Sequence, residues 1–229
     1  MRTAAVLARI AMGIAIIAAV VVQLVASIEF AGRDGSSDAG DVVVNFLSYF
    51  TVDSNSLAAI VLLCGAALLA RNRPDTHTFA VIRLAVTTYM VITGIVYNLL
   101  LRGLLVQGNV VAWSNEVLHL IGPLYLLLDW LFAPGRRPLR SRDAVPALVF
   151  PAVWLVYTLV RGPFATDPFR PTDYWYPYPF LNPVTSAGGY GTVAVYSVGI
   201  AVAVVGVAMG LAWISRRWPA TAVGTAAVH

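Results

Sequence analysis

The chain has 229 residues, of which 59% are hydrophobic and only 11% are charged, with a mean hydropathy of +0.78. Water-soluble domains carry about 25% charged residues, so this composition excludes a soluble globule and predicts an all-α polytopic membrane protein. The formal charge of +4 comes from Arg alone, and the absence of Lys excludes a retinal-type Schiff base.

Six apolar stretches are long enough to cross a bilayer, which takes about 20 helical residues each. We place the predicted spans at residues 4–28, 43–70, 79–106, 112–132, 144–160 and 190–214. The first is too long for a signal peptide and is interpreted as an anchor. The fifth is short and holds Pro146 and Pro151, which predicts a kinked or tilted helix. The chain 1–229 is therefore predicted to be a single six-helix transmembrane domain.

The placement of the arginines indicates the orientation. With these spans, eleven of the fifteen Arg lie on one side, and only Arg33, Arg102, Arg161 and Arg170 lie on the other. Basic loops are retained in the cytoplasm, so both termini are predicted to be cytoplasmic, in a cell membrane. The Lys-free, Arg- and Ala-rich composition is typical of a GC-rich bacterial genome. Residues 218–229, rich in Ala, Gly and Thr, are predicted to be a disordered tail.

Polar residues within the spans are candidates for a site, because an ionisable group there costs about 2.5–3.5 kcal/mol on insertion scales. In the second span, Ser48, Thr51 and Asn55 fall on one face of the predicted helix. In the fourth span, Glu116 and His119 are three residues apart and share a face. Each span therefore offers a polar surface to its neighbours.

The third span adds Asn98 and Arg102, four residues apart near its outer end. At a rise of 1.5 Å per residue, Thr51, His119 and Asn98 lie about 10–12 Å below the outer ends of their helices. A shared depth is what an intramembrane site requires. Structural interpretations stay open: Thr bonding to its own helix, Asn joining helices, and a surface ion pair between Glu116 and Arg102.

The predicted outer loop, residues 161–189, concentrates aromatic residues and prolines between positions 174 and 180. Trp175, Tyr176 and Tyr178 fit an aromatic belt at the membrane surface, and they equally fit a semi-rigid lid over an opening between helices. The two interpretations are compatible with each other.

Two charged residues near the inner ends of the spans are interpreted as structural. Asp129 is predicted to pair with Arg136 or Arg140. Arg83 is predicted to extend along its helix to the inner surface. Neither residue is assigned a role in chemistry.

Several functions are excluded by missing motifs. His119 is the only histidine within a span, so a b-type haem with two axial histidines is excluded. The sequence has no HExxH, GxSxG, Walker or dinucleotide-binding motif, and its single Cys64 cannot form a disulfide or a cysteine-built metal site. We therefore predict no metal, no cofactor and no nucleic-acid partner. No pattern indicates an oligomeric state.

Five segments of the sequence carry a resemblance to a known family. They are YFTVDSN at 49–55, NEVLHLIGPL at 115–124, DWLF at 129–132, VYTLVRG at 156–162 and WYPYPFLNP at 175–183. They resemble the bacterial six-pass relatives of the androgen-induced protein family, which includes the androgen-dependent TFPI-regulating protein. Animal members of that family are membrane hydrolases of fatty acid esters of hydroxy fatty acids.

The resemblance implies a threonine nucleophile with a histidine partner, and the matching positions are Thr51 and His119. A Thr hydroxyl needs a base within about 2.6–3.2 Å to take its proton, a role that neutral His119 suits. Glu116 is a candidate to orient the imidazole. Candidate oxyanion donors are Asn55, Asn98 and Arg102. We expect a lipid ester from the bilayer as substrate, with Trp175, Tyr176 and Tyr178 closing over it.

Two other functions are kept as alternatives. A small lipid or solute transporter, or a lipid-binding protein, would use the same polar cavity without chemistry. A structural membrane subunit would pair its Asn and His residues across helix interfaces with no cavity beside them. The position of Thr51 relative to His119 separates these alternatives best.

Overall fold

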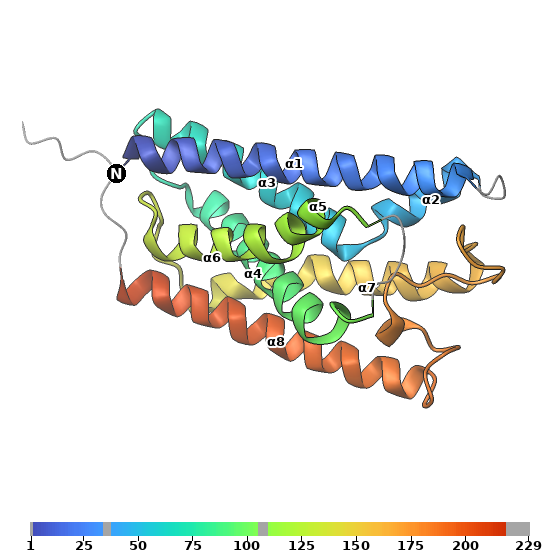
Figure 1. Cartoon of the computed structure of the whole chain (residues 1–229). Helices are drawn as coiled ribbons and strands as arrows, with labels where there is room; N and C mark the ends of the chain where they lie inside the picture. Colours follow the sequence, from blue (N-terminus) through green and yellow to red (C-terminus); the bar gives the residue numbers. More distant parts are fainter. Residues whose placement is uncertain (1, 34–37, 105–109, 219–229) are drawn as a thin grey trace, which may run out of the picture.

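A computed structural model describes residues 2–33, 38–104 and 110–218 of the chain (Figure 1). Every regular element in these ranges is helical, which confirms the predicted all-α class. The α-helices are α1 (Arg2–Arg33), α2 (Ala39–Leu47), α3 (Phe50–Ala70), α4 (His77–Val96), α5 (Ala112–Glu116), α6 (Gly122–Phe132), α7 (Val149–Arg161) and α8 (Tyr190–Arg217). The shorter elements are the π-helical turns η1 (Tyr97–Leu101) and η2 (Val117–Ile121) and the 3-10 turns η3 (Ser141–Leu148), η4 (Gly162–Phe164) and η5 (Pro179–Leu181). The end of the predicted third span and nearly all of the predicted tail lie outside the described residues.

Within the described ranges, five helical segments are long and apolar enough to cross a membrane. They are Arg2–Arg33, Phe50–Ala70, His77–Leu101, Ser141–Phe164 and Tyr190–Arg217. The predicted fourth span, residues 112–132, is continuous helix through α5, η2 and α6. It is not one of the five, and its Asn115, Glu116, His119 and Asp129 make it the more polar segment. A sixth span at this position stays a prediction.

The helical segments run back and forth between two ends of one bundle (Figure 1). We call the end with residues 71–76, 133–140 and 216–218 the arginine end, and the end with residues 162–189 the loop end. Helix α1 packs along α3, and α4 contacts α3, α6 and α8, which makes it the central helix. Small residues at the α1–α3 contact, including Gly13 and Ala59, let the two backbones approach closely.

The predicted second span is broken near the loop end. Helix α2 ends at Leu47, Tyr49 is extended, and α3 begins at Phe50. The Ser48 hydroxyl donates to the carbonyl of Val44 at 2.7 Å, a bond that competes with continuation of the helix. The prediction that Ser48, Thr51 and Asn55 share one helical face is therefore wrong, because Ser48 lies outside α3.

The predicted fifth span changes helix type along its length. Residues Ser141–Leu148 form the 3-10 turns of η3, with Pro146 inside, and α7 continues from Val149. Proline lacks the N–H that an α-helix interior needs, so the tighter helix type coincides with Pro146. The expected irregularity is present as a change of helix type.

Buried ion pairs join three segments of the bundle at the arginine end. Arg9 Nε lies 2.8 Å from Asp129 Oδ1, and Arg83 Nη2 lies 2.7 Å from Asp129 Oδ2. Arg83 Nη1 lies 2.8 Å from Asp75 Oδ2, and all four side chains are at least 97% buried. The predicted partners of Asp129 and the predicted surface position of Arg83 are therefore wrong.

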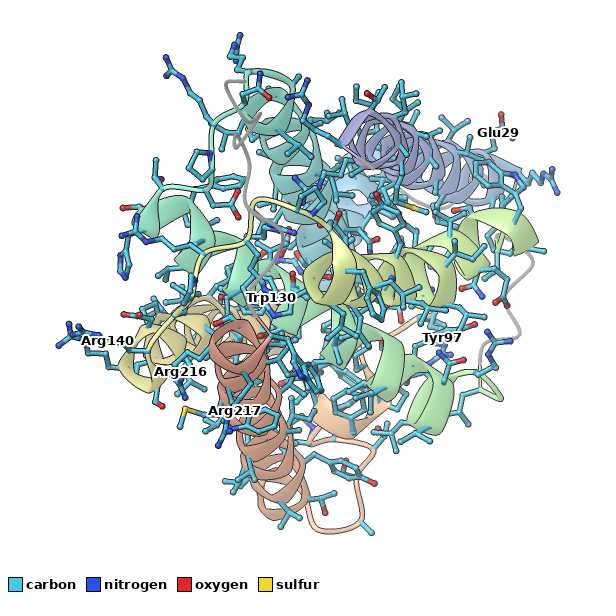
Figure 2. All side chains as sticks on the ribbon, turned by 90° about the vertical axis from the view of Figure 1, so that its left-hand side faces the viewer. Glu29, Tyr97, Trp130, Arg140, Arg216 and Arg217 are labelled. Carbon is cyan, nitrogen blue, oxygen red and sulfur yellow. The ribbon has the colours of Figure 1, made fainter. Side chains whose placement is uncertain are left out.

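These charges are buried deep in the bundle and pair with residues that are distant in the sequence. Arg9 comes from α1, 120 residues away from Asp129, and sequence spacing gives no sign of that contact. Two Arg and two Asp balance each other, and Arg9 also donates to the carbonyl of Gly65. Arg136 instead donates to the backbone carbonyls of Trp130 and Trp218, and its guanidinium faces the Trp130 ring (Figure 2 labels Trp130 among the side chains of this end).

Candidate functional site

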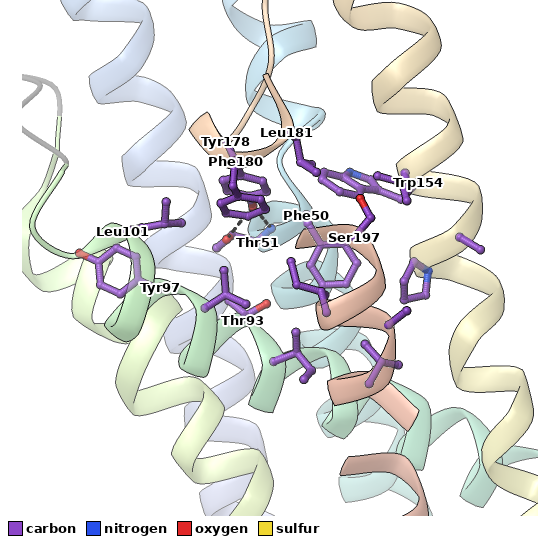
Figure 3. Close-up of a pocket in the computed structure, with 18 of the residues that line it drawn as sticks. Phe50, Thr51, Thr93, Tyr97, Leu101, Trp154, Tyr178, Phe180, Leu181 and Ser197 are labelled. Atoms are coloured by element: carbon purple, nitrogen blue, oxygen red, sulfur yellow. Dashed lines mark hydrogen bonds between the residues drawn. The ribbon is translucent and has the colours of Figure 1, made fainter. Parts of the chain in front are cut away.

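An apolar cavity of about 300 Å³ lies towards the loop end, between α3, α4, α7 and α8. Its walls are mainly aliphatic and aromatic side chains, and the η5 segment closes it on the side of the loop (Figure 3). Six lining residues carry a polar side-chain atom: Thr51, Thr93, Tyr97, Trp154, Tyr178 and Ser197. A largely apolar pocket with a few polar groups is typical of a small-molecule or lipid site.

Thr51 lies at the polar end of this cavity, in the first turn of α3. Amides in the first turn of a helix have no partner within the helix, and the Tyr178 hydroxyl accepts from the Thr51 N–H at 3.2 Å. The same hydroxyl lies 3.2 Å from Thr51 Oγ1 (dashed lines in Figure 3). Burial raises the pKa of Tyr178 to about 12, so its hydroxyl is protonated at neutral pH. Thr51 itself is only 9% exposed.

Two π-helical turns, η1 and η2, face each other beside the cavity. A π turn inserts an extra residue into a helix, and such turns are frequent at functional sites. Asparagine amides hold η2 in place: Asn55 Nδ2 donates to the Leu118 carbonyl at 3.1 Å, and Asn98 Nδ2 donates to the His119 carbonyl at 3.2 Å. Asn55 also donates to the carbonyl of Thr51, so one side chain links the Thr51 turn to the turn that carries His119.

His119 is fixed from two sides. Its Nδ1 lies 2.9 Å from the Asn115 carbonyl, which only accepts, so Nδ1 carries the hydrogen and Nε2 is left as an acceptor. Its ring stacks on Tyr97 with 3.9 Å between ring centroids, and Asn115 Nδ2 donates to the Tyr97 hydroxyl. Tyr97 lines the cavity and His119 does not. The Tyr97 ring therefore stands between the cavity and the imidazole, and Thr51 and His119 share no hydrogen bond.

The other residues expected around the histidine form a separate polar cluster. Glu116 Oε2 lies 2.8 Å from Arg102 Nη2, and these side chains are 38% and 43% exposed. Arg102 Nε also donates to Asn98 Oδ1. Glu116 thus contacts Arg102 and not His119, whose Nδ1 is taken by Asn115. None of Glu116, Arg102, Asn98 and Asn55 lines the cavity.

The three aromatic candidates of the loop have different positions. Tyr178 reaches the cavity and contacts Thr51. Trp175 is buried beside the cavity against Tyr49, with the Arg161 guanidinium 5.5 Å from its ring centroid. Tyr176 lines a shallower hollow on the outside of the loop. Of the three, only Tyr178 is placed to touch a ligand in the cavity.

Sequence reasoning missed three polar groups of the site. Tyr97 is not among the residues that the sequence analysis singles out, although its ring separates the cavity from His119. Thr93 and Ser197 were passed over, although a hydroxyl in an apolar span is the kind of signal that identified Thr51. Thr93 Oγ1 lies 3.1 Å from Ser54 Oγ, while the Ser197 hydroxyl is buried without a hydrogen-bond partner.

Among residues 2–33, 38–104 and 110–218, no group of three or more His, Cys, Asp or Glu side chains is arranged to hold a metal ion. Comparisons of the chain with protein-family models, with characterised proteins and with solved structures find no match.

Proposed function

We propose that the protein is an intramembrane hydrolase of lipid esters, with Thr51 as nucleophile and His119 as base. The observation that carries this proposal is the Thr51 hydroxyl at the polar end of an apolar cavity, within a bundle whose helices are apolar enough to cross a membrane. The cavity suits the acyl chain of a lipid, including the fatty acid esters of hydroxy fatty acids that the family resemblance implies. No cofactor is needed for this reaction.

The first turn of α3 gives Thr51 an environment suited to acyl transfer. A helix N-terminus stabilises negative charge, and the Tyr178 hydroxyl oxygen lies 3.2 Å from both the Thr51 backbone nitrogen and Thr51 Oγ1. An ester carbonyl oxygen placed between the Thr51 N–H and the Tyr178 O–H would accept a hydrogen bond from each of these two donors. One oxyanion donor is typically worth about 2.7–4 kcal/mol of barrier. This role falls to Tyr178 because the amides of Asn55 and Asn98 already donate to carbonyls.

The reaction proceeds in two balanced steps. Thr51 Oγ1 bonds to the ester carbonyl carbon as its proton passes to His119 Nε2, and the departing alcohol then takes that proton as its C–O bond breaks. Water attacks the acyl-threonine in the second step, again with His119 as base, which releases the fatty acid and restores the hydroxyl. Both steps require the imidazole to reach the cavity, and therefore require the Tyr97 ring to turn aside.

The role of Tyr97 is testable without a substrate. Tyr97→Ala removes the ring between the cavity and His119, so carbethoxylation of His119 by diethyl pyrocarbonate should become severalfold faster. Phe180→Ala is the matched control, because Phe180 also lines the cavity and has no contact with His119. Equal labelling rates in both variants and in wild type, read by mass spectrometry, would contradict a separating role for Tyr97.

The enzyme assignment is tested by ester turnover in detergent. Thr51→Ala and His119→Ala should each abolish turnover of branched fatty-acid esters, while Thr51→Ser should retain it because a hydroxyl remains. Thr93→Ala is the control, since Thr93 lines the same cavity without the proposed chemistry. Wild-type protein that neither turns over any such ester nor reacts with a fluorophosphonate would remove the support for an enzyme.

We further propose six membrane spans, with the arginine end in the cytoplasm of a bacterial cell. Seven arginines lie in the segments that define this end. Arg2 and Arg142 lie next to these segments and Arg9 and Arg83 lie within the bundle, which supports cytoplasmic termini by the positive-inside rule. Attachment of a membrane-impermeant thiol reagent to single cysteines at Arg71 and at Asp173, in a Cys64→Ser background, tests this. Reaction at Arg71→Cys in intact cells would contradict it.

One observation favours a second function, lipid binding without hydrolysis. The Thr51 hydroxyl contacts Tyr178 and not His119, and a protein that only holds an acyl chain needs no base. Transport is less well supported, because the buried ion pairs of Arg9, Arg83, Asp75 and Asp129 occupy the arginine end. Retention of a bound fatty acid by Thr51→Ala, combined with absence of turnover in wild type, would select the binding function.

A further inference from the structure

Two of the residues that line the cavity are exposed, and they form one edge of it. Ala152 of α7 and Ala201 of α8 are exposed, while the other lining residues are buried or half-buried. We propose that the cavity opens sideways between α7 and α8, and that the end of a lipid acyl chain leaves through this opening into the bilayer. This inference rests on the proposed lipid site. It adds where an acyl chain passes between the cavity and the bilayer, and it implies a preference of the site for long chains.

The arrangement of α7 and α8 supports an opening between them. Near the arginine end, α8 packs against η3, from which α7 continues, and towards the loop end α8 packs against η5. Between these two contacts, α7 and α8 hardly touch each other. The side chains at the edge are alanines, which leaves width for a methylene chain. Of the side chains labelled in the pocket close-up, Trp154 belongs to α7 and Ser197 to α8, and Thr51 and Tyr178 lie nearer the loop (Figure 3).

The depth of the opening fits the end of a chain. Ala152 lies eleven residues after Ser141 and twelve before Phe164, at the middle of that candidate span. Ala201 lies eleven residues after Tyr190 and sixteen before Arg217. At about 1.5 Å per residue, both positions are roughly 15 Å or more from the ends of their helices, which is half of a hydrocarbon core of about 30 Å. Acyl chains end at this level of a bilayer.

The surroundings of the opening are apolar. Exposed valines flank it on both helices: Val153 and Val156 on α7, and Val198 and Val202 on α8. Such faces are suited to lipid, so the opening leads to hydrocarbon and not to water. A volume of about 300 Å³ is at the lower limit for ligand pockets, which start at about 300 Å³. A long chain with its ester at Thr51 therefore needs the opening, whereas a short chain does not.

The opening is tested by filling it with a large side chain. Ala201→Trp should lower kcat/KM for a palmitate ester by about tenfold or more, while kcat/KM for the matching butyrate ester stays within about twofold. Ala203→Trp is the matched control, because Ala203 is exposed on the same helix and does not line the cavity. Ala152→Trp, from the opposite side, should repeat the effect of Ala201→Trp. Equal chain-length profiles in Ala201→Trp, Ala203→Trp and wild type would overturn the inference.

A binding measurement separates this inference from the proposed hydrolysis. Palmitate and butyrate are compared as competitors of a fluorescent long-chain fatty acid bound to the purified protein. Selective loss of palmitate competition in Ala201→Trp supports the opening even if wild type hydrolyses no ester. Unchanged palmitate competition in that variant contradicts the opening, whatever the outcome of the turnover assay.

Discussion

The two ends of the bundle solve the problem of buried polar groups differently. At the arginine end, full charges are buried, and Arg9, Arg83, Asp75 and Asp129 each have a partner within 2.8 Å. Towards the loop end, the buried groups around Thr51 are neutral hydroxyls and amides, most of them bonded to backbone carbonyls. The cavity lies only beside the second set.

The difference follows from the cost of leaving each kind of group without a partner. An unpaired charge in a low-dielectric interior costs several kcal/mol, so the charged network allows no gap beside it. A neutral hydroxyl costs about 1–3 kcal/mol, which a ligand can recover by supplying a hydrogen bond. The break near Ser48 and the turns η1 and η2 also lie around the cavity. The tightly packed charged network thus lies at the arginine end, and the cavity lies towards the loop end.

The largest expected effect breaks the charged network. Asp129→Asn replaces the carboxylate shared by Arg9 and Arg83 with an amide. The amide keeps one acceptor oxygen, turns its other end towards a guanidinium as an NH2 donor, and leaves one buried guanidinium without a counter-charge. We expect a loss of about 3–5 kcal/mol in the free energy of unfolding, measured by denaturant titration in micelles. Glu116→Gln is the control, because its pair with Arg102 is half-exposed, and it should lie within experimental error of wild type. A similar loss in both variants would contradict the comparison of the two ends.

A middle-sized effect disturbs the site end. A Cβ at Gly122 would meet the Val117 carbonyl oxygen at 2.7 Å and the Met90 side chain at 3.3 Å. Gly122→Ala must therefore shift η2, with a loss of about 1–3 kcal/mol in the free energy of unfolding. Gly206→Ala is the matched control, since nothing lies within 4 Å of its Cβ position on α8. Gly122→Ala should also move the NMR signals of His119, which lies in η2. Unchanged His119 signals in Gly122→Ala would show that η2 does not need glycine at this position.

The sequence was sufficient for features that depend on composition and period. Helical class and five of the six predicted spans follow from apolar stretches of helix-spanning length, because such stretches need no tertiary information. Local breaks were harder. The interruption at Ser48–Tyr49 depends on the packing of Tyr49 against Trp175 and Tyr178, which come from a distant loop.

The site was predictable only residue by residue. The rule that polar residues in spans are candidates identified Thr51 and His119, and the structure brings their segments together through Asn55. The orientation of the side chains was beyond the rule, because His119 lies inside the π turn η2, and a spacing argument that assumes an α-helix does not describe how Glu116 and His119 are placed relative to each other. Asn115 and Tyr97 therefore orient the His119 imidazole, a role that the sequence analysis expected for Glu116.

The smallest expected effect concerns the contact that closes the cavity. Tyr178→Phe removes the hydroxyl that accepts from the Thr51 N–H, so we expect a loss of about 0.5–1.5 kcal/mol in the free energy of unfolding at neutral pH. The control is Tyr157→Phe, which removes a different tyrosine hydroxyl, bonded to Ser48. Each variant loses one tyrosine hydroxyl and its hydrogen bonds, but only Tyr178→Phe leaves a helix amide beside the cavity without a partner.

The pH dependence of stability tests the burial of the Tyr178 hydroxyl. Burial raises the pKa of Tyr178 from 10.0 to about 12, so the folded protein holds this proton more tightly than the unfolded chain does. The resulting stability is fully present below pH 10 and is lost as the pH rises from 10 towards 12. The alkaline decline in the free energy of unfolding should therefore be shallower in Tyr178→Phe than in wild type, so that the gap between the two proteins narrows above pH 10. A constant gap would mean that Tyr178 is not buried against Thr51, and the loop would then leave the cavity open to water.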